Sequence, residues 1–179
     1  MKKIKILPLT LIAALMLAAL APGALAAESV EAPELGSAAA VIAEADTGRV
    51  LYELNADEQR YPASLTKVMT VLLTVEAIER GEASLDDTVT AGMEAIQGMY
   101  YAGSTSNIQA GEEMTLRDLM YCAMLGSANE ACNIIAVHIS GSLDAFVALM
   151  HEPAAALACT GTHFHHTHGP PDSAHYTPP

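Results

Sequence analysis

The chain has 179 residues with 21 Asp and Glu against 8 Lys and Arg, giving a formal net charge of −13, which leaves no basic surface for phosphates and argues against nucleic-acid binding. Hydrophobic residues make up 51% of the sequence and charged residues 16%, a composition too apolar for a disordered chain. Three cysteines cannot all pair within one chain, so a small fold held together by disulfides is excluded.

The N-terminus has the order of features of a secretory signal peptide. Three lysines lie within the first five residues, residues 6–20 are apolar except for one proline and one threonine, and small residues surround Ala26. The apolar run is short for a membrane span. We therefore predict a signal peptide over residues 1–26, cleaved near Ala26, and an exported, extracytoplasmic protein. Cleavage would change the formal net charge to −16 and leave Lys67 as the only lysine.

A flexible leader and a β-hairpin are expected next. Residues 27–37 are mostly polar and include a proline. Residues 38–43 are apolar, residues 49–53 alternate in part between polar and apolar, and the two segments flank a turn that contains Gly48. Two such segments around a glycine-containing turn predict an antiparallel hairpin.

A long apolar helix is expected over residues 64–80. Its apolar residues cover nearly the whole circumference of a helix, so we expect it to lie inside the domain. Gly81 fits the position just past its C-terminus.

The second half of the chain is expected to be mainly helical. Residues 85–111 are polar and glycine-rich and predict loops and small strands rather than a helix. Thr115 to Asp118 resembles an N-terminal cap, and apolar residues at helical spacing follow it. Two further helices are predicted over residues 131–139 and 143–157, the second with an interior proline.

Ser64 and Lys67 are the strongest candidates for chemistry, in the motif Ser-x-x-Lys. Residues three apart share one face of a helix, so the Lys67 amine can reach the Ser64 hydroxyl. Ser64 would lie in the first turn, where free backbone N–H groups favour developing negative charge. An apolar helix would also lower the pKa of Lys67 and make it a general base. The motif is common by chance, but here it uses the one lysine outside the N-terminal segment.

A second polar motif, Ser127-Ala128-Asn129, lies between two apolar helical segments. Ser127 could relay a proton to a leaving amine, and the Asn129 amide could bind a substrate carbonyl. Ser and Asn are also favoured N-cap residues, and Ser127 taken alone fits such a cap better than a catalytic role.

The two motifs together have the order used by penicillin-binding proteins and serine β-lactamases. From about Ala38 to near its end, the chain resembles the low-molecular-mass D-alanyl-D-alanine carboxypeptidases, penicillin-binding proteins of peptidase family S11. The blocks that carry this resemblance are residues 45–52, 61–67, 111–119, 127–131, 162–164 and 175–177.

The resemblance implies an α+β fold of the β-lactamase/transpeptidase type and a serine-type D-Ala-D-Ala carboxypeptidase. Such an enzyme removes the terminal D-alanine from peptidoglycan stem peptides in the cell envelope. Ser64 would be the nucleophile that forms the acyl-enzyme, and Lys67 its base. Ser127 would assist proton transfer to the departing D-alanine, and Asn129 would bind the substrate. β-Lactam antibiotics would acylate Ser64 and stall there; no metal or organic cofactor is implied.

The family's third motif, Lys-Thr-Gly, is absent from the sequence. In the family, that strand binds the terminal carboxylate of the substrate and supplies the second oxyanion N–H. We therefore expect residues 38–179 to be a partial catalytic domain: the hairpin and the helical part, without the later sheet strands. Such a fragment would be inactive or nearly so and, with an exposed sheet edge, poorly stable. Contact with a membrane surface is expected only for a full-length protein.

Four histidines lie within residues 163–168, and His175 follows. Neutral imidazoles are good metal ligands. No Cys, Asp or Glu accompanies them at a recognisable zinc spacing, and family-like segments explain His163, His168 and His175. The sequence therefore favours no metal site.

Two other functions remain open. A serine β-lactamase also uses Ser-x-x-Lys, but class A enzymes carry aspartate where this chain has Ala128, and no candidate for their deacylating glutamate loop is present. A non-catalytic envelope protein that binds peptidoglycan peptides would not need Lys-Thr-Gly.

Overall fold

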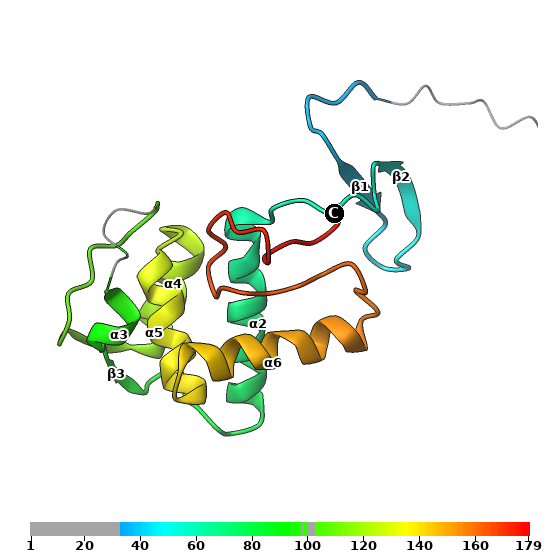
Figure 1. Ribbon diagram of the computed structural model, residues 1–179. Coiled ribbons are helices and arrows are strands. Elements are labelled where there is room, and N and C mark those ends of the chain that lie inside the picture. Colours follow the sequence, from blue (N-terminus) through cyan, green and yellow to red (C-terminus); the bar gives the residue numbers. More distant parts are fainter. Residues whose placement is uncertain (1–32, 98, 100–102) are drawn as a thin grey trace, which may run out of the picture. The chain divides into compact units, whose positions relative to one another are not determined.

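The computed structural model describes residues 33–97, 99 and 103–179. The predicted signal peptide, residues 1–26, and the first part of the predicted leader, residues 27–32, lie outside the described residues. Residues 33–36 contain no helix or strand. Residues 37–179 form one unit that carries the described helices and strands (Figure 1).

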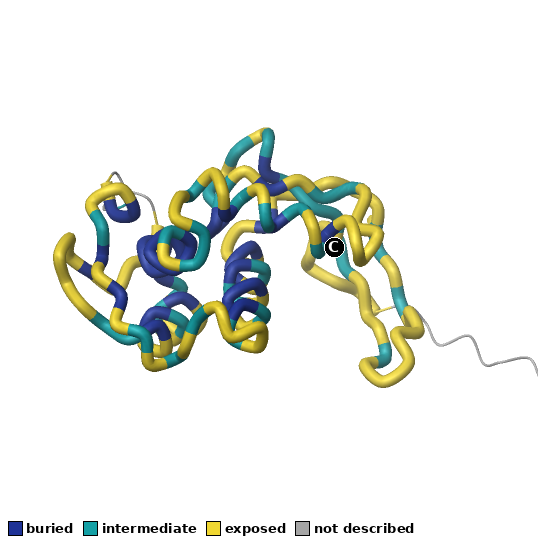
Figure 2. Tube along the Cα trace, turned by 90° about the horizontal axis from the view of Figure 1, so that it is seen from below, coloured by how far each residue is buried: buried dark blue, intermediate teal, exposed yellow. Residues whose placement is uncertain are grey.

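The predicted N-terminal hairpin is confirmed. Strand β1 (Ala40–Ala43) pairs antiparallel with β2 (Val50–Leu54). In the turn between them, the Glu44 carboxylate accepts hydrogen bonds from the backbone N–H groups of Asp46 and Thr47, at 2.9 and 2.8 Å. Most residues of the hairpin are exposed (Figure 2), so turn chemistry and strand pairing hold it more than burial does.

A short 3₁₀ turn, η1 (Ala63–Leu65), leads into helix α2 (Thr66–Glu79). The prediction that this helix is enclosed on all sides is wrong. A stripe at helical spacing is exposed: Leu65, Val68, Leu72 and Val75. The buried face is largely polar: Thr66, Lys67, Thr70, Leu73, Thr74 and Ala77. This face can be buried because its polar groups are bonded; Thr70 Oγ1, for example, donates to the backbone oxygen of Thr167. As predicted, Gly81 ends the helix, with φ +75°.

The stretch between α2 and the later helices is mostly loop, as predicted. Strand β3 (Thr88–Thr90) pairs antiparallel with β4 (Glu113–Thr115). The expectation of no helix is wrong for α3 (Met93–Ile96), which buries Ala95 and Ile96 and packs against a later helix. Four residues are too few to show a helical period in the sequence.

Three helices follow in close succession. Helix α4 (Leu116–Leu125) begins at the predicted cap, where Thr115 Oγ1 accepts the Asp118 N–H at 3.1 Å. Helix α5 (Asn129–Ser140) begins two residues before its predicted start, and α6 (Leu143–Ala156) contains the predicted interior proline.

Helix α5 lies at the centre of the core. Eight of its twelve residues are buried, and it packs against α2, α3, α4 and α6. The buried residues of the helices are dark blue in Figure 2. Within the described residues, no single helix is long and apolar enough to span a membrane; α5 and α6 reach that length and composition only as a pair bent by 86°.

After α6 the chain runs to Pro179 without a further helix or named strand. Isolated bridges pair Arg60 with Thr177 and His163 with Tyr176. The segment is tied to α2 by side chains: Thr66 Oγ1 lies 2.7 Å from His175 Nε2. This C-terminal segment (residues 157–179, orange to red in Figure 1) thereby covers the polar face of α2.

Candidate active site

The start of α2 brings the two residues of the Ser-x-x-Lys motif together, as their spacing predicts. Ser64 Oγ and Lys67 Nζ lie 2.9 Å apart. Ser64 is exposed, whereas only 2% of Lys67 is exposed. A substrate can therefore reach the hydroxyl while the amine stays out of bulk water.

Burial lowers the pKa of Lys67 from its usual value of 10.5, because removal from water disfavours the charged amine. Two neighbours act the other way, Cys132 and Glu130. Burial raises the pKa of the Cys132 thiol to about 12, so this thiol is neutral at physiological pH and Glu130 is the relevant negative group. The Lys67 amine also donates to the backbone oxygen of His168 at 3.1 Å. A lowered pKa suits a group that must accept the serine proton.

Ser127 lies in the turn between α4 and α5, and its hydroxyl donates to Ser64 Oγ at 3.0 Å. The N-cap interpretation is wrong, since the N-cap of α5 is Ala128 and no side chain caps this helix. Ser127 has φ +54°, and Ala63, directly before Ser64, has φ +48°. A positive φ costs a non-glycine residue roughly 1–3 kcal/mol, and such conformations are frequent at functional sites. Backbone of this kind thus occurs at Ser127 and directly before Ser64.

Asn129 and Ser64 line the same pocket, which has a volume of about 290 Å³. Asn129 is the first residue of α5, is 7% exposed, and donates its backbone N–H to the backbone oxygen of Ser104 at 2.9 Å. The remaining wall is formed by Ala63, Gly103, Ser104, His168, Gly169, Pro170 and Pro171. The structure thus brings all four sequence-predicted site residues to one place.

The wall formed by residues 168–171 was not predicted as part of the site. Gly169 lies directly against η1: it has φ +84°, and a Cβ atom there would overlap the backbone oxygen of Ala63. Because only glycine allows this close approach, the loop can bring the His168 carbonyl to Lys67. The Gly-Pro-Pro sequence of the loop is the one local signal that could have indicated a fixed turn.

We expect the Gly169→Ala substitution to destabilise the protein by about 3 kcal/mol, because it adds a steric overlap to the cost of a left-handed residue. Gly48→Ala is the matched control: Gly48 also has positive φ, +69°, but nothing lies within 4 Å of an added Cβ. The control should cost about 1 kcal/mol. Urea unfolding of both variants measures the difference, and equal costs would contradict the close packing of this loop.

Glu130 is a second feature that the motifs did not single out. It is 2% exposed, and its Oε1 accepts from Thr105 Oγ1 at 2.7 Å and from the Ser106 N–H at 2.6 Å. Its Oε2 is buried without a hydrogen-bond partner among the described residues. A carboxylate at the start of an apolar helix, next to Asn129, was the available signal in the sequence.

Glu130→Gln is expected to shift the pH profile of Ser64 acylation to lower pH. Glutamine keeps an oxygen for Thr105 and Ser106 but removes the negative charge that raises the pKa of Lys67. Less negative charge near the amine lets it lose its proton at lower pH. Acylation rates of the two proteins between pH 6 and 11 measure the shift; the exposed Glu113→Gln variant is the control. A profile that stays in place would show that Glu130 does not act on Lys67.

The fold is that of the penicillin-binding proteins. The family profile of D-alanyl-D-alanine carboxypeptidases, peptidase S11, matches residues 26–177. The chain belongs to this family.

Individual relatives agree with this assignment. The chain is 36% identical over 171 residues to the D-alanyl-D-alanine carboxypeptidase DacF of Bacillus subtilis, covering 94% of this chain and 43% of the relative. It is 36% identical to the carboxypeptidase DacC of Escherichia coli, covering 83% of this chain and 38% of the relative. Among solved structures, penicillin-binding protein 5 of Haemophilus influenzae superposes with a TM-score of 0.80 at 30% identity, covering 83% of this chain and 43% of that chain.

These similarities confirm the predicted α+β fold of the transpeptidase type. They also confirm that the chain matches only part of that fold. The chain spans less than half the length of these three relatives. Its described residues contain two sheets of two strands each.

Proposed function

We propose that the protein is a serine-type D-Ala-D-Ala carboxypeptidase of the cell envelope that acts on peptidoglycan stem peptides. One observation carries the proposal: the exposed Ser64 hydroxyl lies within hydrogen-bond distance of both a buried amine and a second hydroxyl. Family membership supports the substrate class, since the relatives bear the name D-alanyl-D-alanine carboxypeptidase. The predicted signal peptide supports the location.

In the acylation step, the neutral Lys67 amine accepts the Ser64 proton as Oγ attacks the carbonyl carbon between the two D-alanines. The backbone N–H of Ser64, at the start of the helix, donates to the oxygen that becomes negative. The proton then passes through Ser127 to the leaving nitrogen, and the C–N bond breaks. Asn129 holds the acyl part of the peptide by its carbonyl group. D-Alanine leaves and an ester to Ser64 remains.

Water hydrolyses this ester and restores the serine. β-Lactams present the same kind of amide within a ring, so the leaving nitrogen stays attached to the acyl group after the bond breaks. The tethered product blocks the site, and the adduct persists. Peptidoglycan stem peptides and β-lactam antibiotics are therefore the proposed ligands.

The test is release of D-alanine from a synthetic stem pentapeptide ending in D-Ala-D-Ala, measured with the full product of the gene. The proposal predicts release that a penicillin inhibits and slow turnover of the chromogenic cephalosporin nitrocefin. Rapid nitrocefin turnover without D-alanine release would instead identify a β-lactamase. Binding of the peptide without release would identify a non-catalytic peptidoglycan-binding protein, the alternative that the missing Lys-Thr-Gly motif favours.

A further inference from the structure

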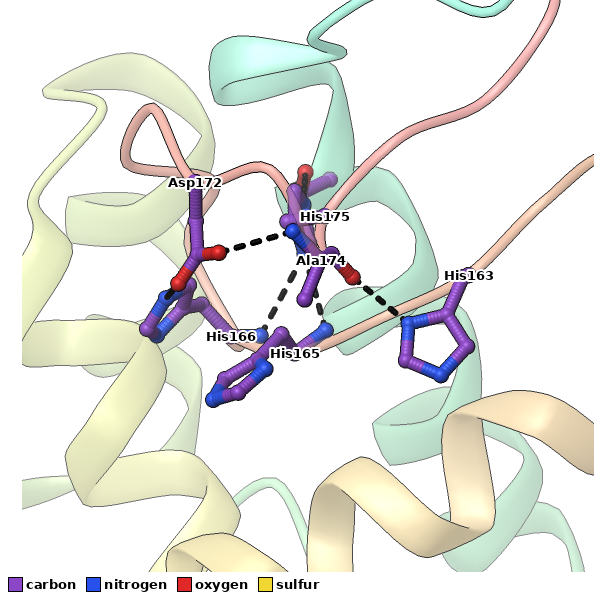
Figure 3. A network of polar contacts seen from close by, with 7 residues as sticks. His163, His165, His166, Asp172, Ala174 and His175 are labelled. Atoms are coloured by element: carbon purple, nitrogen blue, oxygen red, sulfur yellow. Dashed lines mark hydrogen bonds and ion pairs between the residues drawn. The ribbon is translucent and has the colours of Figure 1, made fainter.

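Three side chains of the C-terminal segment converge on one point outside the catalytic candidates. One ligand atom each from His165, His166 and Asp172 lies within 4.8 Å of the other two. His166 Nε2 is 2.9 Å from Asp172 Oδ2. Figure 3 shows the His166 ring and the Asp172 carboxylate facing each other, with the His165 ring nearby.

Backbone contacts hold the three residues in this arrangement. The N–H groups of His165 and His166 both donate to Nδ1 of the buried His175 ring, at 3.0 and 3.3 Å. Because Nδ1 accepts these bonds, Nε2 carries the ring proton and donates to Thr66 Oγ1, at 2.7 Å. The two histidines are thereby anchored to α2.

The Asp172 carboxylate is oriented from its other side. Its Oδ1 accepts the Ala174 N–H at 2.8 Å, and its backbone oxygen accepts the His175 N–H at 2.9 Å. The second carboxylate oxygen is left facing His166 (Figure 3). The His175 ring therefore holds the backbone of the two histidines, and the backbone N–H groups of Ala174 and His175 hold Asp172.

We propose that His165, His166 and Asp172 bind a divalent metal ion of the zinc type, with one coordination position open to solvent. Two imidazoles and a carboxylate suit this ion and match a three-ligand open site. Bond lengths near 2.1 Å place tetrahedral ligand atoms about 3.4 Å apart. The ligand atoms now lie within 4.8 Å of one another, and the exposed His165 ring can turn to shorten the longer separation.

The sequence favoured no metal site partly because no acidic residue stands at a zinc spacing from the histidines, yet in three dimensions an aspartate lies beside two of them. Asp172 follows His166 by six residues, and the turn through Gly169 and two prolines folds it back beside the imidazole. A spacing set by a turn of this kind does not match the common zinc motifs.

A metal ion bound at His165, His166 and Asp172 would affect the pocket beside Ser64. His166 and Asp172 are the two ends of the loop that holds the His168 carbonyl against Lys67 and lines the pocket with Gly169, Pro170 and Pro171. A bound ion would join the two ends of this loop. It would therefore rigidify one wall of the pocket, whatever reaction takes place there.

Calorimetric titration of the untagged full chain with Zn²⁺ in a non-coordinating buffer tests the site. The experiment uses a Cys159→Ser background, because this thiol is exposed. We expect one ion per chain, and His166→Ala and Asp172→Asn should each weaken binding by about tenfold or more. His138→Asn is the matched control: its Nε2 lies 3.3 Å from Asp87 Oδ2, a His–Asp pair without a second histidine, and affinity should not change.

Absence of Zn²⁺ binding, or equal affinity in the ligand variants and the control, would overturn the proposal. Asp172→Asn keeps the oxygen that accepts the Ala174 N–H, so it remains informative if His166→Ala does not fold. Hydrogen exchange provides a second readout: Zn²⁺ should slow exchange of the His168 and Gly169 amides in the parent protein and not in Asp172→Asn. Binding without such slowing would contradict the effect on the pocket wall.

Discussion

In the full product of the gene, the Ser64→Ala substitution is expected to abolish covalent labelling by a fluorescent penicillin. The Ser64 hydroxyl is exposed, lines the pocket and lies 2.9 Å from Lys67 Nζ, so it is the oxygen that we expect the drug to acylate. Without it, the acyl group has no acceptor. Gel fluorescence after incubation with the labelled drug measures the result.

Two controls accompany this experiment. Ser84→Ala removes an exposed serine far along the chain and should label like the parent protein. Ser127→Ala removes the second hydroxyl of the site and should slow labelling, by about 10²-fold, because it removes a proton relay and not the nucleophile. Labelling that survives in Ser64→Ala would show that the nucleophile is another residue.

Replacing Lys67 is expected to have the second largest effect. Lys67→Met keeps the length of the side chain and its burial but removes the base, so acylation should slow by about 10³-fold. Lys67→Arg keeps the positive charge, and its guanidinium cannot give up a proton near neutral pH. We expect both variants to lose most of the acylation rate, because the group at position 67 must accept a proton and a positive charge alone is insufficient. Stopped-flow acylation measures both rates, and a melting curve verifies that each variant folds.

The same assignment predicts a pH dependence. Burial lowers the pKa of Lys67 below 10.5, so the fraction of neutral amine, and with it the acylation rate, should rise with pH with a midpoint below that value. Lys67→Arg should show no such rise. If Lys67→Arg retained most of the parent rate, the amine would act by its charge and not as a base.

The parts of the fold that depend on residues close together in the sequence were predictable. The hairpin followed from an apolar and a partly alternating segment around Gly48, and the cap of α4 from Thr115 and Asp118. The approach of Ser64 to Lys67 followed from helical geometry alone. Each of these depends on interactions within a few residues.

The parts that depend on contacts between distant segments were not predictable in the same way. The sequence placed apolar side chains around α2, but it could not show that the C-terminal segment covers the polar face and leaves Val68 and Leu72 exposed. The pairing of Ser127 with Ser64 spans 63 positions, and local preference alone pointed to a helix cap. The approach of Asp172 to His166 likewise needs the turn that Gly169 makes against η1.

The most direct measurement is mass spectrometry of tryptic peptides of the full product of the gene after reaction with a penicillin. Trypsin separates the two serines of the site: Ser64 falls in the peptide of residues 61–67, where it is the only serine, and Ser127 in the peptide that begins at Asp118. The proposed chemistry predicts the added mass of the drug on the first peptide, at Ser64. An adduct on the peptide from Asp118, or no adduct on either, would contradict the assignment of Ser64 as a nucleophile activated by Lys67.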